Sequence, residues 1–309
     1  SAVILVPAKG GVAVGTEKSW AYAKEQGIPR MFYISKMDEE NANFFEVLDQ
    51  LVNTFGKSVI AIQVPILEGD KFVGVVDIIN MKAKKFDKDK LVDADIPAGL
   101  TDKVNELKEA LKEAVAETDE ALMEKFFEGE EFTRDEIVKG LRIGIADGSI
   151  VPVMCGAAIN NAGTQLLMDA IIEFLPAPDA RPVVKSKKPG TDEIIELKAS
   201  PDESLSALVF KTIADPFVGK ISIFRVYSGT LKSDSVVYNS SAEKTEKIAQ
   251  VFMLRGKKQI PVDKLIAGDI GAVAKLQYTN TNDTLCEQGK PVELSKIEFP
   301  EPMLSLAVE

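Results

Sequence analysis

The sequence has 309 residues, 45% of them hydrophobic and 28% charged, which is enough for two or three globular domains. Its formal net charge of -11 excludes a general basic field of the kind that coats nucleic acid, and no DNA partner is expected. Histidine is absent and the two cysteines, Cys155 and Cys286, lie far apart, which excludes histidine-dependent dyads, histidine-ligated metals and a disulfide framework, and favours a reducing cytoplasm.

Both ends of the sequence fall inside regular patterns. "SAVILVPA" opens within a buried-strand pattern without a Met, and "PMLSLAVE" stops within an alternating one. We therefore expect a piece of a longer protein. No apolar run approaches the roughly 18 residues that span a bilayer, and no signal-peptide pattern is present. Neither a membrane partner nor secretion is predicted.

The first part of the sequence alternates between buried strands and helices. Residues 2–6 form a short continuous apolar run, 15–24 read as a helix, and 28–34 repeat the strand signal. Apolar positions at helical spacing over residues 43–55 predict a second helix, with Gly56 as its stop. This alternation predicts an α/β domain with a parallel sheet, which we assign to residues 1–180.

Residues 63–150 have a different character and are predicted to form an inserted α+β subdomain. Strand patterns at 58–64 and 72–79 lead to a charged helical region at 101–140, in which Thr133 and Glu136 offer a capping box. A buried strand at 151–154 and a helix at 164–175 then complete the α/β domain.

The remainder of the sequence predicts an all-β domain. Residues 181–203 are rich in Pro, Lys, Ser and Asp and are interpreted as a linker or an exposed hairpin. Short strands follow at 205–213, 220–227, 235–239, 246–254 and 269–276, and their even spacing predicts a small closed barrel over residues 204–293. Residues 294–309 are expected to begin a third domain.

The first candidate site follows the strand at 28–34, in "ISKMDEEN". Open parallel sheets place their ligands at the carboxyl ends of strands. There Asp38 can accept two hydrogen bonds from the N1 and amino group of guanine, and Lys36 can lay its stem along the base. The alternative is a solvated Lys36 and an Asp38 that caps the next helix through Glu39 or Glu40.

The second candidate segment is "VPVMCGAAINNAG", which also ends a strand and turns into a helix. The small residues Gly156, Ala157 and Ala158 allow backbone N–H groups to approach a planar ligand closely. A simple tight turn is the alternative for this segment taken alone. Together the two segments match the guanine-recognition pair of GTPases.

With the rest of the sequence, these loops resemble the elongation factor G family of ribosomal translocases. "GTEK" at residues 15–18 and "ISKMDEENA" at 34–42 are similar to the family's helix and NKMD loop, and "MCGAAINNAG" to its SA loop. "DPFVGKISIFRVYSGTL" and "AGDIGAV" resemble its second domain, and "FPEPMLSLAVE" the entry to its third. The resemblance implies a P-loop-GTPase-type parallel sheet, truncated at its N-terminus, with an inserted α+β subdomain and an all-β translation-factor barrel.

The resemblance also implies roles for individual residues. Lys36 would pack on guanine and ribose, Asp38 would bind N1 and the amino group, and Ala158 would offer its N–H to the guanine carbonyl. Two positions depart from the family: Ser35 stands for its Asn, and Ala157 for its SA-loop Ser. Both changes remove polar support around the base, so we expect a divergent paralogue or weakened guanine selectivity.

The phosphate half of a GTPase site is missing from this sequence. No GxxxxGK[ST] is present, because Thr16 and Glu17 follow the glycines at 10–15, and no DxxG follows a strand. We expect GTP or GDP with Mg²⁺ to bind the full-length protein, and this chain alone to hold no metal and to neither bind nor hydrolyse GTP appreciably. The parent protein is expected to be a GTPase.

The expected partners are the ribosome, its RNA and its proteins, including the stalk. Five acidic residues of the inserted subdomain are interpreted either as a solvated helix face or as a docking surface: Glu106, Glu109, Glu113, Glu117 and Glu124. Four basic residues of the barrel could touch ribosomal RNA phosphates or protect strand edges: Lys211, Lys220, Arg225 and Lys232. Phe217 is predicted to pack on the barrel. The alternative function is a factor-like ribosome-binding or interaction module in which GTP turnover is weak or lost.

Overall fold

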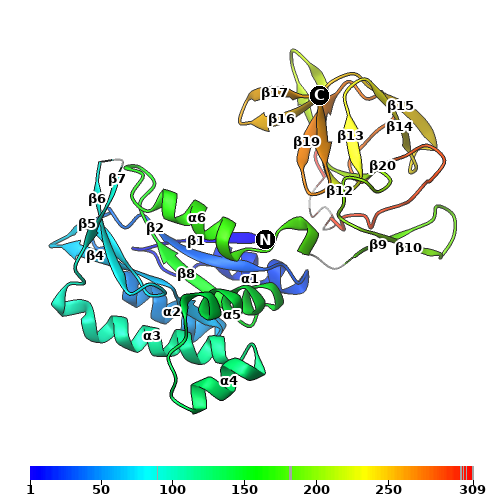
Figure 1. Ribbon diagram of the computed structural model, residues 1–309. Coiled ribbons are helices and arrows are strands. Elements are labelled where there is room, and N and C mark those ends of the chain that lie inside the picture. The colour runs from blue at the N-terminus through cyan, green and yellow to red at the C-terminus, as the bar shows by residue number, and fades with distance from the viewer. Residues whose placement is uncertain (89, 181–182, 300, 302, 304, 308–309) are drawn as a thin grey trace. The chain divides into compact units, whose positions relative to one another are not determined.

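The structure is a computed structural model that describes residues 1–88, 90–180, 183–299, 301, 303 and 305–307 (Figure 1). It divides into two compact units, Ser1–Pro176 and Ala177–Glu309. Each unit has hydrophobic clusters of its own, and no residue of the large cluster in the first unit belongs to the clusters of the second.

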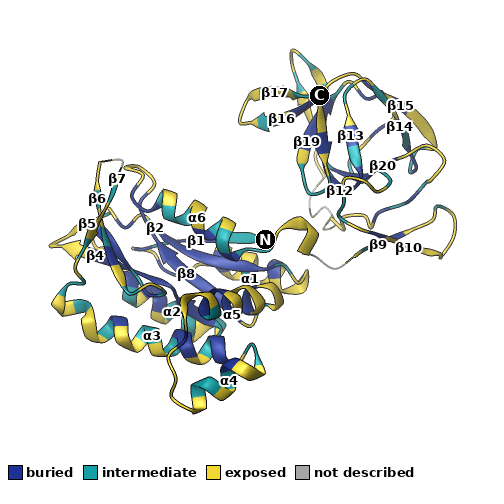
Figure 2. Cartoon of the chain, in the orientation of Figure 1, coloured by how far each residue is buried: buried dark blue, intermediate teal, exposed yellow. Residues whose placement is uncertain are grey.

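A four-stranded parallel sheet forms the centre of the first unit. It consists of β1 (Ala2–Pro7), β2 (Arg30–Ser35), β8 (Val151–Cys155) and β3 (Val59–Ala61), in that order. The strands are mostly apolar because helices lie on both faces of the sheet. Figure 2 shows β2 and β8 dark blue along most of their length, as expected for the innermost strands.

The helices of this unit follow their strands as the sequence predicts. They are α1 (Val14–Glu25), α2 (Phe44–Phe55) and α6 (Thr164–Phe174). Figure 1 shows α6 on one side of the parallel sheet and α1 and α2 on the other. Trp20 of α1 stacks with Phe32, with the two ring centroids 5.6 Å apart, and the Arg30 guanidinium carbon lies 3.9 Å from the centre of the Trp20 ring. The predicted parallel α/β sheet is confirmed.

An α+β subdomain lies between β3 and β8 in the chain. Its antiparallel sheet runs in the order β4 (Gln63–Glu68), β5 (Lys71–Asp77), β6 (Lys82–Asp87) and β7 (Lys90–Ala94). A short 3₁₀ helix and three α-helices follow: Ala98–Leu100, α3 (Thr101–Ala116), α4 (Glu120–Phe127) and α5 (Arg134–Asp147). The large core cluster includes side chains from the parallel sheet and from this subdomain, so the two share one core.

The start of α5 has the capping box that its sequence predicts. The Thr133 Oγ1 accepts the N–H of Glu136 at 3.3 Å, and the Glu136 carboxylate accepts the N–H of Thr133 at 2.8 Å. Two backbone donors that lack helical partners are thereby satisfied. Lys125 of α4 binds the same carboxylate at 2.7 Å, so this cap also joins α4 to α5.

The second unit begins with a short 3₁₀ helix, Pro178–Ala180, and a hairpin, which is one of the two alternatives predicted for residues 181–203. The strands β9 (Val184–Lys187) and β10 (Ile194–Leu197) pair antiparallel, and Leu197 is 7% exposed in a cluster with Leu208 and Val292. The apolar residues of the hairpin stand among many polar ones, which obscures its strand pattern. The described part of this segment is therefore packed against the β-sheet of its own unit.

The rest of the second unit is antiparallel sheet. Eight strands are ordered β15-β14-β20-β11-β12-β19-β16-β17, and β13 and β18 form a separate pair. Their bounds are β11 (Ser206–Asp215), β12 (Gly219–Ser228), β13 (Thr230–Lys232), β14 (Ser235–Asn239), β15 (Lys244–Ile248), β16 (Val251–Arg255), β17 (Lys258–Val262), β18 (Lys264–Ile266), β19 (Ile270–Ala274) and β20 (Thr284–Cys286).

This sheet wraps around one apolar cluster to which nearly every strand contributes, including Phe224, Ile248 and Val273. Its order has two edge strands, β15 and β17, and among the described residues no pairing joins them. The predicted closed barrel is thus an open, wrapped sheet. The predicted strand at 246–254 is two strands, because the chain breaks at Ala249 and Gln250 to bond with residues 233 and 234.

The tip of the β11–β12 hairpin corrects the prediction for Phe217. The Asp215 carboxylate accepts the N–H groups of Phe217 and Val218, both at 2.9 Å, which holds the turn and lowers the pKa of that carboxyl. Phe217 is 96% exposed and does not pack on the sheet. The turn geometry directs this ring outward, a feature that a hydrophobic residue type alone does not reveal.

Candidate guanine site

Two loops follow neighbouring strands of the parallel sheet and are joined by backbone hydrogen bonds. In the register of β2 and β8, Ile34 lies opposite Cys155. The N–H of Gly156 donates to the Ile34 oxygen at 3.0 Å, and the N–H of Met37 donates to the Gly156 oxygen at 3.2 Å. The loop after β2 and the loop after β8 therefore form one continuous ledge at the carboxyl edge of the sheet.

The loop after β2 places its three candidate residues in different settings. Ser35 is half-buried and its Oγ donates to the Val6 oxygen at 3.4 Å, so it is directed at β1. Lys36 takes a left-handed backbone with φ of 61° and its Nζ binds Glu39 at 2.8 Å. Asp38 is exposed, and no described residue donates a hydrogen bond to its carboxylate. A free carboxylate is the group that guanine recognition requires.

The alternative role for Asp38 as a helix cap is wrong. The cap of α2 is Asn43, whose side chain accepts the N–H of Glu46 at 3.2 Å. The alternative of a solvated Lys36 agrees in part with the structure, because the Lys36 ammonium lies in solvent and pairs with Glu39. That pair raises the pKa of Lys36 through the hydrogen bond with Glu39.

The loop after β8 presents one free backbone donor. The N–H of Ala157, which is fully buried, donates to the Ala162 oxygen at 2.8 Å. Ala158 is exposed, its oxygen accepts the N–H of Asn161 at 3.3 Å, and in the part of the chain that the structure describes nothing accepts its own N–H. Only the second of the two alanines can therefore donate to a ligand.

Tyr33 supports this loop from beneath, a role that the sequence alone did not indicate. Its side chain is 4% exposed, and burial raises the pKa of its hydroxyl. A Cβ on Gly156 would lie 1.8 Å from the Tyr33 hydroxyl oxygen and 2.6 Å from the Ala162 oxygen. Gly156 is required here for close approach. The polar tip at the end of an otherwise apolar strand is the signal that points to Tyr33.

The glycine-rich turn after β1 is already occupied by a side chain of α2. The Oε1 of Gln50 accepts the N–H of Val12 at 3.0 Å, and a Cβ on Gly11 would lie 2.0 Å from that oxygen. The N–H groups of Gly11 and Val12 are therefore both engaged within the chain. Within the described residues, no group of three or more His, Cys, Asp or Glu side chains is arranged to hold a metal ion.

The four basic residues predicted to face RNA differ in their surroundings. Lys220 donates to the Asn280 Oδ1 at 2.9 Å, and the Arg225 guanidinium carbon lies 5.3 Å from the centre of the Tyr227 ring. Lys211 and Lys232 are exposed. The two exposed lysines are thus the ones available to a partner. None of the described helices is long and apolar enough to cross a membrane.

Comparison with known proteins connects both units to translation factors. Residues 1–177 match the model of the elongation factor Tu GTP binding domain, and residues 204–288 match the model of elongation factor G domain 2. A crystal structure of a protein from Thermus thermophilus is similar, with 29% identity and a TM-score of 0.82 over 97% of this chain. This chain spans 43% of the length of that Thermus chain. The chain described here belongs to the family of translation-factor GTPases.

Proposed function

We propose that this chain is the guanine-recognition half and second domain of a translational GTPase of the elongation factor G type. In this proposal Asp38 accepts from N1 and the amino group of guanine, Lys36 covers the base, and Ala158 donates to the guanine carbonyl. The observation that carries it is the Met37 to Gly156 hydrogen bond, which joins the loops that bear a free carboxylate and a free N–H.

Ser35 and Ala157 set the strength of this site. The Ser35 hydroxyl donates to β1, and Ala157 has no hydroxyl to hold the Asp38 carboxylate, so Asp38 depends on solvent for its orientation. A less ordered carboxylate loses side-chain entropy when it binds guanine, which lowers affinity. We infer a divergent member of the family that still selects guanine but binds it more weakly.

The proposed partners are GTP or GDP and the ribosome, in a cytoplasmic protein that couples GTP hydrolysis to movement of tRNA and mRNA. In the second unit, exposed Lys211 and Lys232 would meet RNA phosphates, and Phe217 would meet a base or an apolar surface. On the inserted subdomain, Glu106 and Glu109 pair with lysines of α3 at 2.8 and 3.7 Å. This pairing favours a solvated face over a stalk-docking surface.

Guanine selection is tested on this chain by titration with guanosine and with adenosine, followed by backbone amide NMR. We expect millimolar guanosine to shift the amides of residues 36–38 and 156–158, and adenosine to leave them in place, because adenine offers no paired donors to Asp38. Asp38→Asn should abolish the guanosine shifts. Equal shifts with both nucleosides would refute guanine selection, and tight stoichiometric GTP binding would refute a half site.

Turnover is tested on the product of the complete reading frame, with ribosomes added. If the protein is a translocase, ribosomes should stimulate its GTP hydrolysis. The Asp38→Asn variant should instead hydrolyse xanthosine triphosphate, because the new side-chain amide donates a hydrogen bond to the xanthine oxygen. The alternative, a ribosome-binding module with lost turnover, is favoured by the departures at Ser35 and Ala157. It expects the protein to sediment with ribosomes without stimulated hydrolysis.

A further inference from the structure

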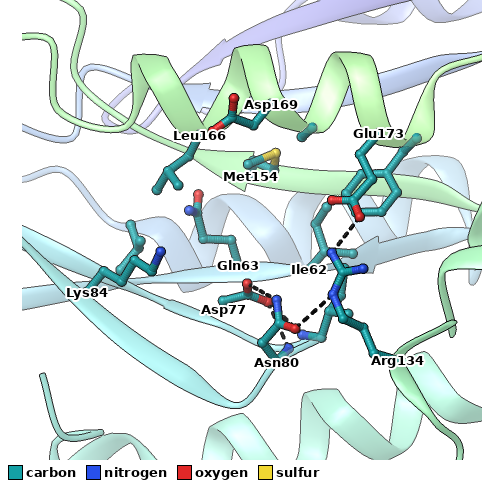
Figure 3. Close-up of a pocket in the computed structure, with 14 residues that line it drawn as sticks. Ile62, Gln63, Asp77, Asn80, Lys84, Arg134, Met154, Leu166, Asp169 and Glu173 are labelled. Atoms are coloured by element: carbon teal, nitrogen blue, oxygen red, sulfur yellow. Dashed lines mark hydrogen bonds and ion pairs between the residues drawn. The ribbon is translucent and has the colours of Figure 1, made fainter. Parts of the chain in front are cut away.

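Gln63 of β4 lies between a cavity and the strand that leads into the second guanine loop. The cavity has a volume of about 230 Å³, and Gln63 and Met154 are among the residues that line it (Figure 3). Gln63 is 4% exposed, and its Oε1 accepts the N–H of Cys155 at 3.2 Å. Because Cys155 is the last residue of β8, this hydrogen bond lies directly before Gly156 and the loop that follows it.

The N–H of Cys155 needs this acceptor because the neighbouring strand is too short to supply one. The register of β3 and β8 ends with Ala61 opposite Val153. Gly156 directs its N–H to β2, so the N–H of Cys155 points to the opposite side, where β3 has ended. A buried N–H without a partner is costly, and the Gln63 oxygen takes the place of a strand partner.

Gln50 of α2 makes the equivalent contact behind the first guanine loop. Its Oε1 accepts the N–H of Val12 at 3.0 Å, in the turn that follows β1. A Cβ on Gly11 would lie 2.0 Å from this oxygen, so the amide lies directly against the backbone of the turn. The turn is thus held by a side chain that lies outside it.

Ala8 connects this turn to the loop at residues 35–43. Its N–H donates to the Ser35 oxygen at 2.8 Å, and its own oxygen accepts the N–H of Asn43 at 3.0 Å. Both ends of the loop that bears the candidate guanine-binding residues are therefore bonded to a single buried residue of the turn. The position of the loop depends on the turn that Gln50 holds.

We propose that Gln50 and Gln63 are positioning residues for guanine binding, an inference that rests on the proposed function. Neither belongs to the loops at 35–38 and 156–158, and each accepts one backbone N–H at the base of one loop. A loop that is held before its ligand binds loses less conformational freedom on binding. Loss of either acceptor should weaken guanine binding although every group that touches the base remains.

The test replaces each glutamine with methionine, which has a similar length and no strong acceptor. Backbone amide NMR of the intact chain gives hydrogen exchange rates without nucleotide, and a guanosine titration gives the affinity. Gln63→Met should raise the exchange rate of the Gly156 N–H by about threefold or more, and Gln50→Met that of the Asn43 N–H. Both variants should weaken guanosine binding by about threefold.

Gln50→Glu is the rescue variant, because it keeps an oxygen for the Val12 N–H and has nearly the helix propensity of Gln and Met. It should keep the exchange rates and the guanosine affinity of the parent chain. Gln165→Met makes the same change at an exposed position of α6 that has no hydrogen-bond partner for its side chain within the described residues, and it should have no effect. Trp20 fluorescence shows that each variant is folded during the titration, which separates weaker binding from lower stability.

The proposal is overturned if Gln50→Met and Gln50→Glu have equal exchange rates and affinities, or if Gln63→Met behaves as Gln165→Met does. If Gln63→Met does not fold, the two Gln50 variants decide. If guanosine leaves the parent chain unshifted, guanine selection itself fails. The exchange rates measured without nucleotide then decide whether the two glutamines hold the loops.

Discussion

Gly156 connects the two loops of the candidate guanine site, and its lack of a side chain is a condition of that connection. Its oxygen accepts from Met37 and its Cα lies against the Tyr33 hydroxyl. We expect Gly156→Ala to destabilise the first unit by about 1–3 kcal/mol, because the new methyl group must displace a buried ring or a backbone carbonyl. Urea unfolding followed by Trp20 fluorescence measures this change.

Gly15 provides the matched control for that substitution. It lies in the first turn of α1, its φ is not in the left-handed region, and a Cβ there would meet nothing within 4 Å. Gly15→Ala should leave stability unchanged or raise it by about 0.5–1 kcal/mol, since alanine restricts the unfolded chain and favours the helix. Equal losses in the two variants would contradict close packing at Gly156.

At the scale of elements, the capping box of α5 has a measurable role. Thr133→Ala removes the oxygen that accepts the Glu136 N–H, and we expect the first unit to lose about 1 kcal/mol of stability. Thr101→Ala at the start of α3 is the control, because Thr101 follows the cap residue Leu100 and its hydroxyl makes only a long hydrogen bond of 3.4 Å to the Pro97 oxygen. Chemical denaturation of both variants should show a loss only for Thr133→Ala.

Glu136 makes the same helix sensitive to acid. The ion pair with Lys125 and the hydrogen bonds from Thr133 lower its pKa to about 2 in the folded protein. The carboxylate therefore stabilises the fold fully above its ordinary pKa of about 4.3, and this contribution is lost as the pH falls through the folded value. Between these two pH values, the free energy of unfolding should fall less in Glu136→Gln than in the parent chain.

The measurement is the urea midpoint of Trp20 fluorescence as a function of pH. Glu128→Gln serves as the control, because Glu128 is exposed and the structure gives its carboxylate no ion pair within the described residues. The control should keep the acid dependence of the parent chain. A Glu136→Gln profile that still follows the parent would show that other carboxyl groups govern acid unfolding.

Elements with an apolar period were predictable from sequence, even among the many charges of residues 101–140, and the lysine-rich strands were not. The strand β8 and the central residues of β2, Met31 to Ile34, are buried on both faces and are apolar without interruption. Strand β6 contains Lys82, Lys84 and Lys85, because its sheet has a solvated face and long side chains that reach water. Its strand character depends on pairing with β5 and β7, which no local pattern encodes.

The candidate site was predictable in its backbone and less so in its side chains. The strand-to-loop transitions at Ser35 and Gly156 follow from apolar runs that end in small or polar residues. The Gln50 contact with the turn after β1 joins residues 38 positions apart, and the Gln63 contact with Cys155 joins residues 92 positions apart. Such contacts arise from tertiary packing, and a lone Gln in the apolar segment 59–67 is the only hint of the second.

At the scale of the whole molecule, the chain has separate cores in its two units. The single tryptophan, Trp20, lies in the first unit, so its fluorescence reports on that unit alone. Phe224 is fully buried in the second core, and Phe224→Ala should destabilise that unit by about 3–5 kcal/mol. Circular dichroism of the β-sheet should show this loss.

The Trp20 midpoint should remain in place in the same variant. If the fluorescence midpoint shifted by as much as the circular dichroism midpoint, the two units would unfold as one. A Phe32→Ala variant in the first core, where Phe32 is fully buried, gives the reciprocal control. It should shift the fluorescence midpoint and leave the circular dichroism transition of the second unit unchanged.

The hydrogen bond from Met37 to Gly156 has a consequence for how a nucleotide would be captured. Both loops are hydrogen-bonded to each other in the absence of a nucleotide. The entropy cost of ordering them is therefore part of folding and does not reduce the affinity for a purine. Substitutions that loosen the pairing of β2 with β8, far from the base itself, should therefore speed nucleotide release while leaving the chemical groups of the loops intact.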